Sequence, residues 1–300
     1  MAPGRYRIES IVRDGERSIV FRARDLRLDM QVWLKIFRPE GFGSAEEVAR
    51  FTWQTRAESQ VKSEHVNGIL DVGIWAPGSP YIASEFLEGS DLATWLGHRG
   101  TLPESQAADF VIQACDALAE AHSLGIVHRD IKPANLFAVE RLGIGASIRV
   151  LGWDISQTSG PFSTTPETAP SGTTEAPTFV GTPLYMPPEQ WQGAPDLDER
   201  ADIWAIGVTL CELVTGQVPF KGGSAIQIYS AIMAGQPRRL RERFPQLPPG
   251  LEAVILKCLQ TERETRYQSV AELALTLTEF GSEQCKRLVD RICSMPQRSS

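Results

Sequence analysis

The segment HRDIKPANLF, residues 128–137, brings three reactive side-chain types close together in the sequence: Asp130, Lys132 and Asn135. A carboxylate can accept a proton from a hydroxyl group, an ammonium can steady an anionic group, and an amide oxygen can ligate a metal ion. These are side-chain types that acid–base and metal-assisted chemistry uses. The first question is therefore which elements of the fold hold these side chains in place.

The same segment resembles the catalytic loop of protein kinases almost letter for letter. The resemblance implies that Asp130 accepts the proton of the incoming hydroxyl and that Lys132 steadies the transferring phosphoryl group. It also implies that Asn135 holds a metal ion. The lysine two residues after the aspartate is similar to the branch of the family that acts on serine and threonine.

Later segments are similar to further landmarks of that family. GTPLYMPPEQ, residues 181–190, resembles the end of an activation segment, with Thr182 in the platform for a peptide substrate and Glu189 as an acidic anchor. The resemblance implies that Glu189 pairs with Arg266 and that Asp202, in a nearly all-apolar helical segment, braces the catalytic loop. The likeness is closest to bacterial Ser/Thr kinases of the eukaryotic type.

Strand-like and helical patterns divide the chain into two parts. Alternating runs such as YRIESIV and QVWLKIF dominate the first part, with one helical segment among them, and helical periodicity dominates the rest. We therefore expect an α+β bilobal fold with a small antiparallel N-lobe at about 5–87 and a larger α-helical C-lobe at about 88–280. Together these would form a kinase-like domain over 1–280, followed by a tail at 281–300.

The resemblance implies a site for ATP and Mg²⁺. Its ATP-binding residues would be Gly15, Val20, Lys35, Glu85 and Leu87. The family places glycines in its phosphate loop because backbone N–H groups must approach the phosphates closely. In VRDGERSIVF the three glycine positions are occupied by Arg13, Gly15 and Ser18, so one glycine is left. This pattern fits a weakened phosphate loop, and it fits a plain β-turn equally well.

A large aromatic residue stands where the family favours alanine beside the adenine ring. In VWLK, residues 32–35, Lys35 corresponds to the lysine that contacts the α- and β-phosphates, and Trp33 precedes it by two positions. Phe137 falls where an aliphatic residue commonly supports the other face of adenine. The two rings could pack together and fill the slot themselves. Alternatively, Trp33 turns outward and a shifted strand leaves the slot open.

The acidic partner of Lys35 is ambiguous in the sequence. In RFTWQTRAESQVKSEH, counting forward from the first part of the segment places Gln54 at the family's glutamate, and counting back from its end places Arg56 there. Glu58 becomes available if the helix slips by about half a turn. The active arrangement needs both this ion pair and a metal-binding aspartate.

The metal-binding aspartate itself is displaced. Aligning IRVLGWDIS with the family's Asp-Phe-Gly pattern places Gly152 at the aspartate, Trp153 at the phenylalanine and Asp154 at the glycine. A second register makes Asp154 the start of the motif, but Gly152 and Trp153 then interrupt the preceding strand. We favour the first register, with Asp154 as a metal ligand because residues two apart on an extended chain share a face.

The stretch from about 156 to 180 is rich in Ser, Thr and Pro, which predicts a mobile activation segment. Thr174 and Thr178 lie near the usual phosphorylation sites of the family. A phosphate added there could pair with Arg129, which precedes the catalytic aspartate.

Composition and sequence patterns limit which class of partner and which cellular compartment we expect for this protein. The net charge of −7 argues against a nucleic-acid binder. Five cysteines without metal-ligand spacing suggest reduced thiols in a cytosol, and no signal peptide or apolar membrane span is apparent. We therefore expect a cytoplasmic protein that acts on or binds other proteins.

Three functions fit these observations. The favoured reading is a pseudokinase that regulates or scaffolds signalling partners, because the nucleotide and metal motifs are altered. The second is an active Ser/Thr protein kinase with an atypical metal site, supported by the intact catalytic loop. The third, a small-molecule phosphotransferase, is weakened by the peptide platform in GTPLYMPPE.

Overall fold

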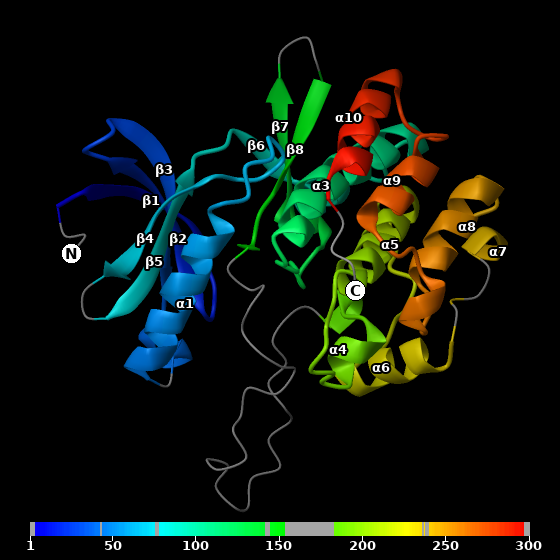
Figure 1. Cartoon of the computed structure of the whole chain (residues 1–300), viewed down its shortest axis with the longest axis horizontal. Coiled ribbons are helices and arrows are strands. Elements are labelled where there is room, and N and C mark those ends of the chain that lie inside the picture. Colours follow the sequence, from blue (N-terminus) through cyan, green and yellow to red (C-terminus); the bar gives the residue numbers. More distant parts are fainter. Residues whose placement is uncertain are drawn as a thin grey trace, which may run out of the picture. The chain divides into compact units, whose positions relative to one another are not determined.

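The computed structural model describes residues 4–153, with gaps at 43, 76–77 and 142–144, and residues 183–296, with gaps at 236 and 238–239 (Figure 1). The chain separates into two compact units, residues 1–88 and 89–300. Four predicted site residues, Asp154, Thr174, Thr178 and Thr182, lie outside the described residues, as does the whole predicted activation segment.

The first unit is an antiparallel sheet with one α-helix among its described residues. Its elements are β1 (Tyr6–Asp14), β2 (Ser18–Asp25), β3 (Met30–Phe37), the 3₁₀ turn η1 (Pro39–Gly41), α1 (Ala45–Glu58), β4 (Ile69–Trp75) and β5 (Ser79–Glu85). The spatial order of the strands is β1-β2-β3-β5-β4. Val32 and Leu34 of β3 are fully buried on one face, whereas Trp33 and Lys35 alternate with them and occupy the other.

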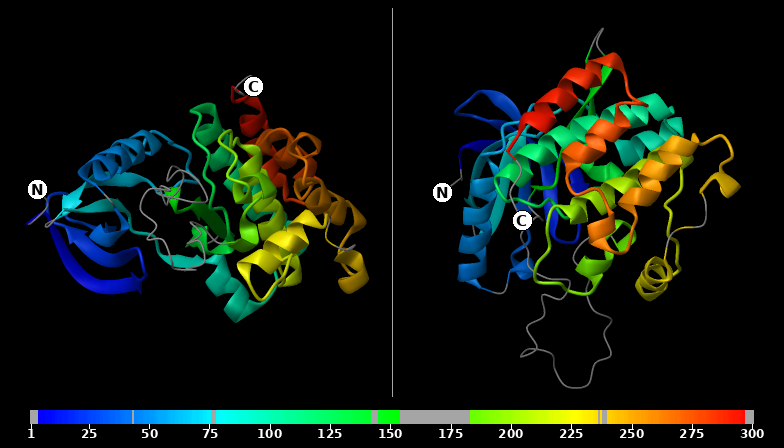
Figure 2. Two further views of the ribbon diagram at one scale, coloured as in Figure 1. Left: turned by 90° about the horizontal axis from the view of Figure 1, so that it is seen from below. Right: turned by 45° about the vertical axis from the view of Figure 1, so that its right-hand side comes forward.

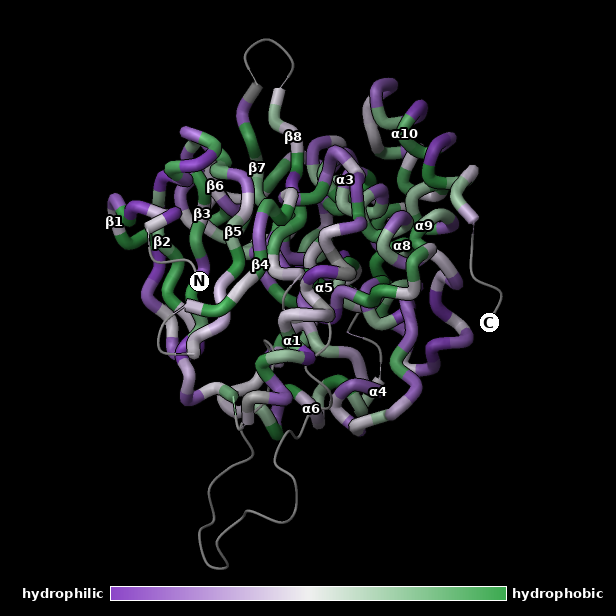
Figure 3. Tube along the Cα trace, turned by 60° about the vertical axis from the view of Figure 1, so that its left-hand side comes forward, coloured by the Kyte–Doolittle hydropathy of each residue, from purple (hydrophilic) through white to green (hydrophobic). Residues whose placement is uncertain are grey.

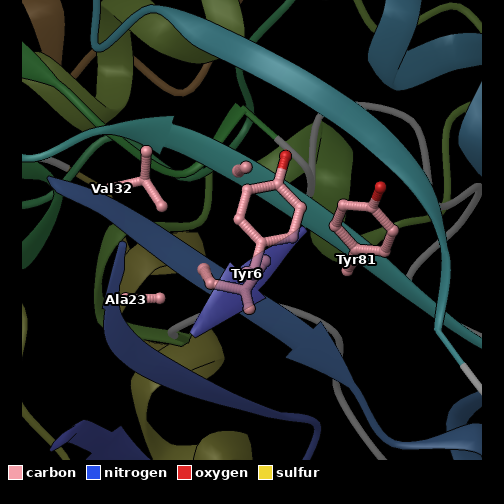
Figure 4. Packing of buried hydrophobic residues seen from close by; sticks show 6 residues of the cluster. Tyr6, Ala23, Val32 and Tyr81 are labelled. Carbon is pink, nitrogen blue, oxygen red and sulfur yellow. The ribbon is translucent and has the colours of Figure 1, made fainter. Parts of the chain in front are cut away.

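Side chains join the two edge strands of this sheet across its buried face. Tyr6 on β1 and Tyr81 on β5 both donate to Asp71 Oδ2 on β4, at 3.0 and 2.8 Å. Arg5 pairs with Asp71 as well, at 2.6 Å, and with Asp25 at the end of β2, at 2.7 Å. Figure 4 shows the two tyrosine hydroxyls on the same side of the apolar cluster. Burial and the bond to Asp71 raise the pKa of Tyr81 to about 12.

The second unit is mostly helical. Its elements are β6 (Gly89–Asp91), α2 (Leu92–Arg99), α3 (Glu104–Ser123), η2 (Pro133–Asn135), β7 (Leu136–Arg141), β8 (Gly145–Val150), η4 (Pro183–Tyr185), α4 (Pro188–Trp191), α5 (Arg200–Thr215), α6 (Ala225–Met233), α7 (Leu240–Arg243), α8 (Pro249–Cys258), η5 (Arg263–Thr265), α9 (Val270–Leu277) and α10 (Glu283–Ser294). Strands β6, β7 and β8 form a small antiparallel sheet in that order. Helix α5 is buried almost all round and packs against α3 and α8, so it forms the centre of the unit.

Residues 281–300, which the sequence analysis set apart as a tail, contain α10. This helix lies across α3 and α9 (Figure 2), and hydrophilic and hydrophobic positions alternate along it (Figure 3). Cys285, Val289 and Ile292 are buried on its inner face. Arg291 donates through Nε to the fully buried Asp116 of α3, at 2.8 Å, which fixes the helix by charge as well as by apolar packing.

The predicted α+β fold is confirmed. The N-terminal unit has the antiparallel sheet and the C-terminal unit has the helices, as the periodicities indicated. Across the described ranges, no helix is both long enough and apolar enough to cross a membrane.

A buried ion pair ties the short helix α4 to the segment before α9. Arg266 donates to both carboxylate oxygens of Glu189, at 2.7 and 2.8 Å, and its side chain is fully buried. Its other N–H groups donate to backbone carbonyls, including that of Gln260 at 2.7 Å. The guanidinium also lies over the ring of Trp204, 5.1 Å from its centroid. Each polar group of the pair is thus satisfied within the protein.

Replacing Arg266 by alanine should lower the free energy of unfolding by about 3–5 kcal/mol, because the carboxylate of Glu189 would stay buried without its partner. Urea unfolding monitored by circular dichroism measures this change. Lys286→Ala, which removes only an exposed pair with Glu283, should change the same free energy by less than about 1 kcal/mol. Equal effects of the two substitutions would contradict this role for the buried pair.

Candidate functional site

The three side chains of the HRDIKPANLF segment meet in the loop between α3 and β7. Lys132 Nζ donates to both carboxylate oxygens of Asp130, at 2.8 and 2.7 Å. Asn135 Nδ2 donates to the backbone carbonyl of Asp130, at 2.7 Å, and to its Oδ2, at 2.8 Å. Asp130 is 5% exposed, so these contacts, rather than water, hold its carboxylate in position.

The loop is braced from beneath by Asp202 of α5, which is fully buried. Its carboxylate accepts the backbone N–H groups of His128, at 2.9 Å, and Arg129, at 2.7 Å, and it accepts His122 Nε2 at 2.8 Å. Burial disfavours the charged form, but the hydrogen bonds from His122 and from the backbone N–H of His128 outweigh it and lower the pKa of Asp202. Arg129 has a φ of 65°, a left-handed conformation that these two backbone bonds hold in place.

The end of β8 is attached to the same loop through two aromatic side chains. The rings of Trp153 and His128 meet edge to face, with centroids 4.7 Å apart, and Trp153 Nε1 donates to the carbonyl of Val150 at 2.9 Å. His128 Nε2 donates to the carbonyl of Leu151 at 2.9 Å, and its Nδ1 accepts the N–H of Asp130 at 3.2 Å. One ring nitrogen thus donates and the other accepts, which is the pattern of a neutral imidazole.

Gly152, at the predicted position of the metal-binding aspartate, packs directly against Asn135. Its φ is +83°, and a Cβ placed on it would lie 2.8 Å from Asn135 Nδ2 and 3.0 Å from Asn135 Cγ. A carboxylate at this position would therefore need Asn135 to move. The described part of the chain contains no group of three or more His, Cys, Asp and Glu side chains that could hold a metal ion. Gly152 and Asn135 alone do not fit a magnesium ion, and Asp154 lies outside the described residues.

In the first unit, Val20 lies on the face of the sheet that carries Lys35, whereas Glu85 stands opposite Val32 and lies on the other face. Val20, Lys35 and Ile82 stand opposite one another on β2, β3 and β5. The ammonium of Lys35 lies over the ring of Phe37, 5.0 Å from its centroid. Leu87 is buried, and the backbone N–H of Glu85 donates to the carbonyl of Gly68 at 3.0 Å.

Trp33 contacts a ring that was not among the predicted site residues. Its indole meets Phe86 edge to face, with centroids 6.2 Å apart, and the guanidinium of Arg22 lies 5.0 Å from the centroid of the same ring. Phe86 follows Ser84 by two residues, and Ser84 stands directly opposite Trp33. The period of two along β5, continued one residue beyond its end, was thus the signal that could have identified Phe86. Using it requires the register between β3 and β5.

Phe137 is buried on β7, where it stands opposite Asp91 of β6 and Arg149 of β8. Gly89 lies beside it, and a Cβ on that glycine would be 3.1 Å from the Phe137 ring. Phe137 therefore belongs to the core of the second unit. Its predicted contact with Trp33, which belongs to the first unit, stays a prediction.

The turn between β1 and β2 is closed by the N–H of Gly15, which donates to the carbonyl of Ser18 at 3.0 Å. Arg38 supports this turn through bonds to the Asp14 carboxylate, at 2.7 Å, and to the carbonyl of Gly15, at 3.2 Å. The single retained glycine thus uses its N–H group within the turn.

Of the three candidate partners for Lys35, Arg56 is exposed on α1, and its Nη2 donates to the carbonyl of Val72 at 3.4 Å. The side chains of Gln54 and Glu58 lie outside the described residues. The identity of the partner of Lys35 stays a prediction.

Comparison with known proteins matches these features to a family. The sequence model of the family described as 'Protein kinase domain' matches residues 6–295 of this chain. The chain is 32% identical over 299 residues to serine/threonine-protein kinase pkn3 of Myxococcus xanthus, a match covering 99% of this chain and 52% of that protein. It is 30% identical over 283 residues to serine/threonine-protein kinase PknB of Mycobacterium leprae, covering 93% and 43%. The chain thus spans about half the length of these relatives.

Among solved structures, the kinase domain of Mycobacterium tuberculosis PknI has a similar fold. The TM-score is 0.70 at 23% sequence identity, and the match covers 92% of this chain and 96% of the PknI chain. At this level of identity the likeness concerns the fold alone.

Gly152→Ala should lower the free energy of unfolding by about 2–4 kcal/mol, because the new methyl group meets Asn135 in a backbone conformation that alanine disfavours. Gly100→Ala is the control: its φ is +78° and nothing lies within 4 Å of the added Cβ, so only the backbone cost of about 1–3 kcal/mol applies. Urea unfolding of both variants isolates the contact with Asn135. Equal losses would show that this contact does not restrict position 152.

Stability should depend on pH through Asp202. Its folded-state pKa lies below the ordinary value of 3.8, so its contribution is fully present above about pH 4 and is lost as the pH falls through the lower, folded-state pKa. The difference in unfolding free energy between the wild type and Asp202→Asn should therefore shrink as the pH falls below about pH 4. A difference that stays constant below pH 4 would contradict the lowered pKa.

Proposed function

The chain belongs to the protein kinase family, and we propose that it is a catalytically impaired member, a pseudokinase that regulates or scaffolds protein partners. One observation carries the proposal: Asn135 packs against Gly152 and leaves no room for a Cβ there. The favoured register aligns Gly152 with the family's metal-binding aspartate. A correctly held metal ion supplies several kcal/mol of charge stabilisation in phosphoryl transfer. Losing about 3–5 kcal/mol slows a reaction by roughly 10²–10⁴-fold.

The first unit supports weak or absent binding of ATP and Mg²⁺. Trp33 and Phe86 place aromatic rings on the face of the sheet that carries Lys35, where the family holds the adenine. The turn at Gly15 uses its glycine N–H internally, which leaves one fewer donor for phosphates. The loss of the metal carboxylate and the crowded base slot thus point in the same direction, although their effects on one site are not additive.

An active Ser/Thr kinase is the second candidate, and the arrangement around Asp130 favours it. Asp130, Lys132 and Asn135 keep the contacts expected of a proton acceptor, a phosphoryl-binding cation and a positioned amide. The Asp202 carboxylate also accepts both backbone N–H groups of the loop, those of His128 and Arg129. In this case Asp154 would have to supply the missing metal ligand, and protein serine or threonine side chains would be the substrates.

Under either function, the activation segment would be the place of regulation. Thr174 and Thr178 would accept phosphate from another kinase, Thr182 would belong to the substrate platform, and Arg129 would receive the added phosphate. Burial lowers the pKa of Arg129, although the nearby Asp202 carboxylate opposes this shift, so a second anion would favour its charged form.

Thermal unfolding with increasing ATP, with and without Mg²⁺, tests the main proposal, because a ligand that binds the folded state raises Tm by mass action. We expect no rise at millimolar ATP and no phosphate transfer to a generic protein substrate. The proposal fails if the wild type binds ATP–Mg²⁺ at micromolar concentration and phosphorylates the substrate while Asp130→Asn does not. The effect of Asp154→Asn would then show whether that residue holds the metal.

Trp33→Ala should create or strengthen ATP binding, because it removes the ring from the base slot. It should also lower the free energy of unfolding by about 2–4 kcal/mol, somewhat less than for a fully buried tryptophan, since the indole is half-buried. Trp53→Ala is the matched control, because Trp53 is 71% exposed on α1 and should affect neither quantity. A Trp33→Ala protein with unchanged stability and no ATP binding would mean that the indole points away from the slot.

A further inference from the structure

The side chains around Trp33 form a row across three strands. Arg22 of β2 stands opposite Trp33 of β3, which in turn stands opposite Ser84 of β5, and all three side chains lie on one face of the sheet. Directly opposed residues have Cβ atoms about 4.5–5.5 Å apart, so their side chains compete for the same space. The largest side chain in the row therefore has one of the smallest beside it.

The contact between Trp33 and Phe86 requires this small neighbour. Phe86 follows Ser84 by two residues and is the ring that the indole meets edge to face, with centroids 6.2 Å apart. The indole must therefore extend diagonally toward β5, over the position that Ser84 occupies. A long side chain at position 84 would fill this space, and the indole could not reach Phe86.

We propose that Ser84 is the positioning residue that allows Trp33 to occupy the base slot. This inference rests on the proposed function, because it explains how the slot is filled from within. The slot is then controlled by a pair of residues, one large and one small, rather than by Trp33 alone. Enlarging Ser84 would displace the indole, whereas removing Trp33 would vacate the slot, so the two changes are distinct.

Ser84 is also fixed by a hydrogen bond from outside the row. Asn67, just before β4, donates through Nδ2 to Ser84 Oγ at 3.1 Å, and Asn67 is 6% exposed. The neighbouring backbone bond from Glu85 to Gly68 runs between the same two segments. The hydroxyl is thus committed to Asn67, which favours one rotamer of Ser84. A residue here must be small for Trp33 and polar for Asn67, and serine satisfies both requirements.

A double-mutant cycle with Trp33→Ala and Ser84→Met tests the proposal in the full chain. In the wild-type background, Ser84→Met should lower Tm by about 3–9 °C, because methionine and the indole compete for one space. In the Trp33→Ala background the same change should leave Tm unchanged or raise it, because methionine fills the vacated space. ATP binding gained by Trp33→Ala should weaken at least threefold in the double variant.

Two control variants separate the effect of side-chain size at position 84 on Tm from other effects of the substitution. Ser84→Ala keeps the side chain small but removes the bond to Asn67, so it should lower Tm by the same amount in both backgrounds. Ser10→Met makes the same size change at the other end of the row, where Ser10 stands opposite Arg22 and is exposed, and its effect should not depend on Trp33.

The proposal is overturned if Ser84→Met lowers Tm equally in both backgrounds. If Ser84→Met alone does not fold, the double variant decides: a folded double variant supports the proposal and an unfolded one contradicts it. Tight ATP binding by the wild type would defeat the pseudokinase function but leave this cycle measurable. If the effects of Trp33→Ala and Ser84→Met on Tm are additive, Ser84 does not position Trp33. The pseudokinase function would then still stand if the wild type neither binds ATP nor transfers phosphate.

Discussion

The fully buried carboxylate of Asp202 is the interaction on which the candidate site depends. It accepts hydrogen bonds from two successive backbone N–H groups of the catalytic loop and from His122 at the end of α3. A charge in this position is tolerated because its hydrogen bonds compensate for the loss of water. Through these bonds the central helix α5 sets the conformation of the loop, and with it the position of Asp130.

This brace explains how the loop could keep its conformation if the metal site is altered as proposed. The conformation of the loop depends on Asp202, on His128 and on the ring of Trp153, none of which needs a metal ion or a nucleotide. The loop sequence can therefore be kept for the stability of the second unit, independently of catalysis. The preserved motif alone does not distinguish an enzyme from a binding protein, whereas Gly152 and Trp33 bear directly on that distinction.

The sequence predicted features that depend on short, fixed spacings. Asp130, Lys132 and Asn135 lie within one loop, so their meeting could be inferred from the motif, and the two-unit fold followed from the change in periodicity. Features that depend on register or on close approach were not predicted. The neighbours Phe86 and Arg22 of Trp33 require the pairing of three strands. The packing of Asn135 against Gly152 requires backbone angles that the residue types do not specify.

Helix α10 determines how much of the chain is needed for an autonomous folding unit. Its arginine, Arg291, is bonded to Asp116, a carboxylate that is itself fully buried in α3. Asp109, about two turns earlier in α3, accepts the N–H of Ser282 at 2.7 Å and so fixes the start of α10. A polypeptide ending at residue 280 would expose the parts of α3 and α9 that pack against α10 and leave Asp116 without Arg291. The smallest stable fragment of the second unit must therefore extend to the end of α10, and proteolytic trimming within that helix would weaken the core of the unit rather than shorten a loose end.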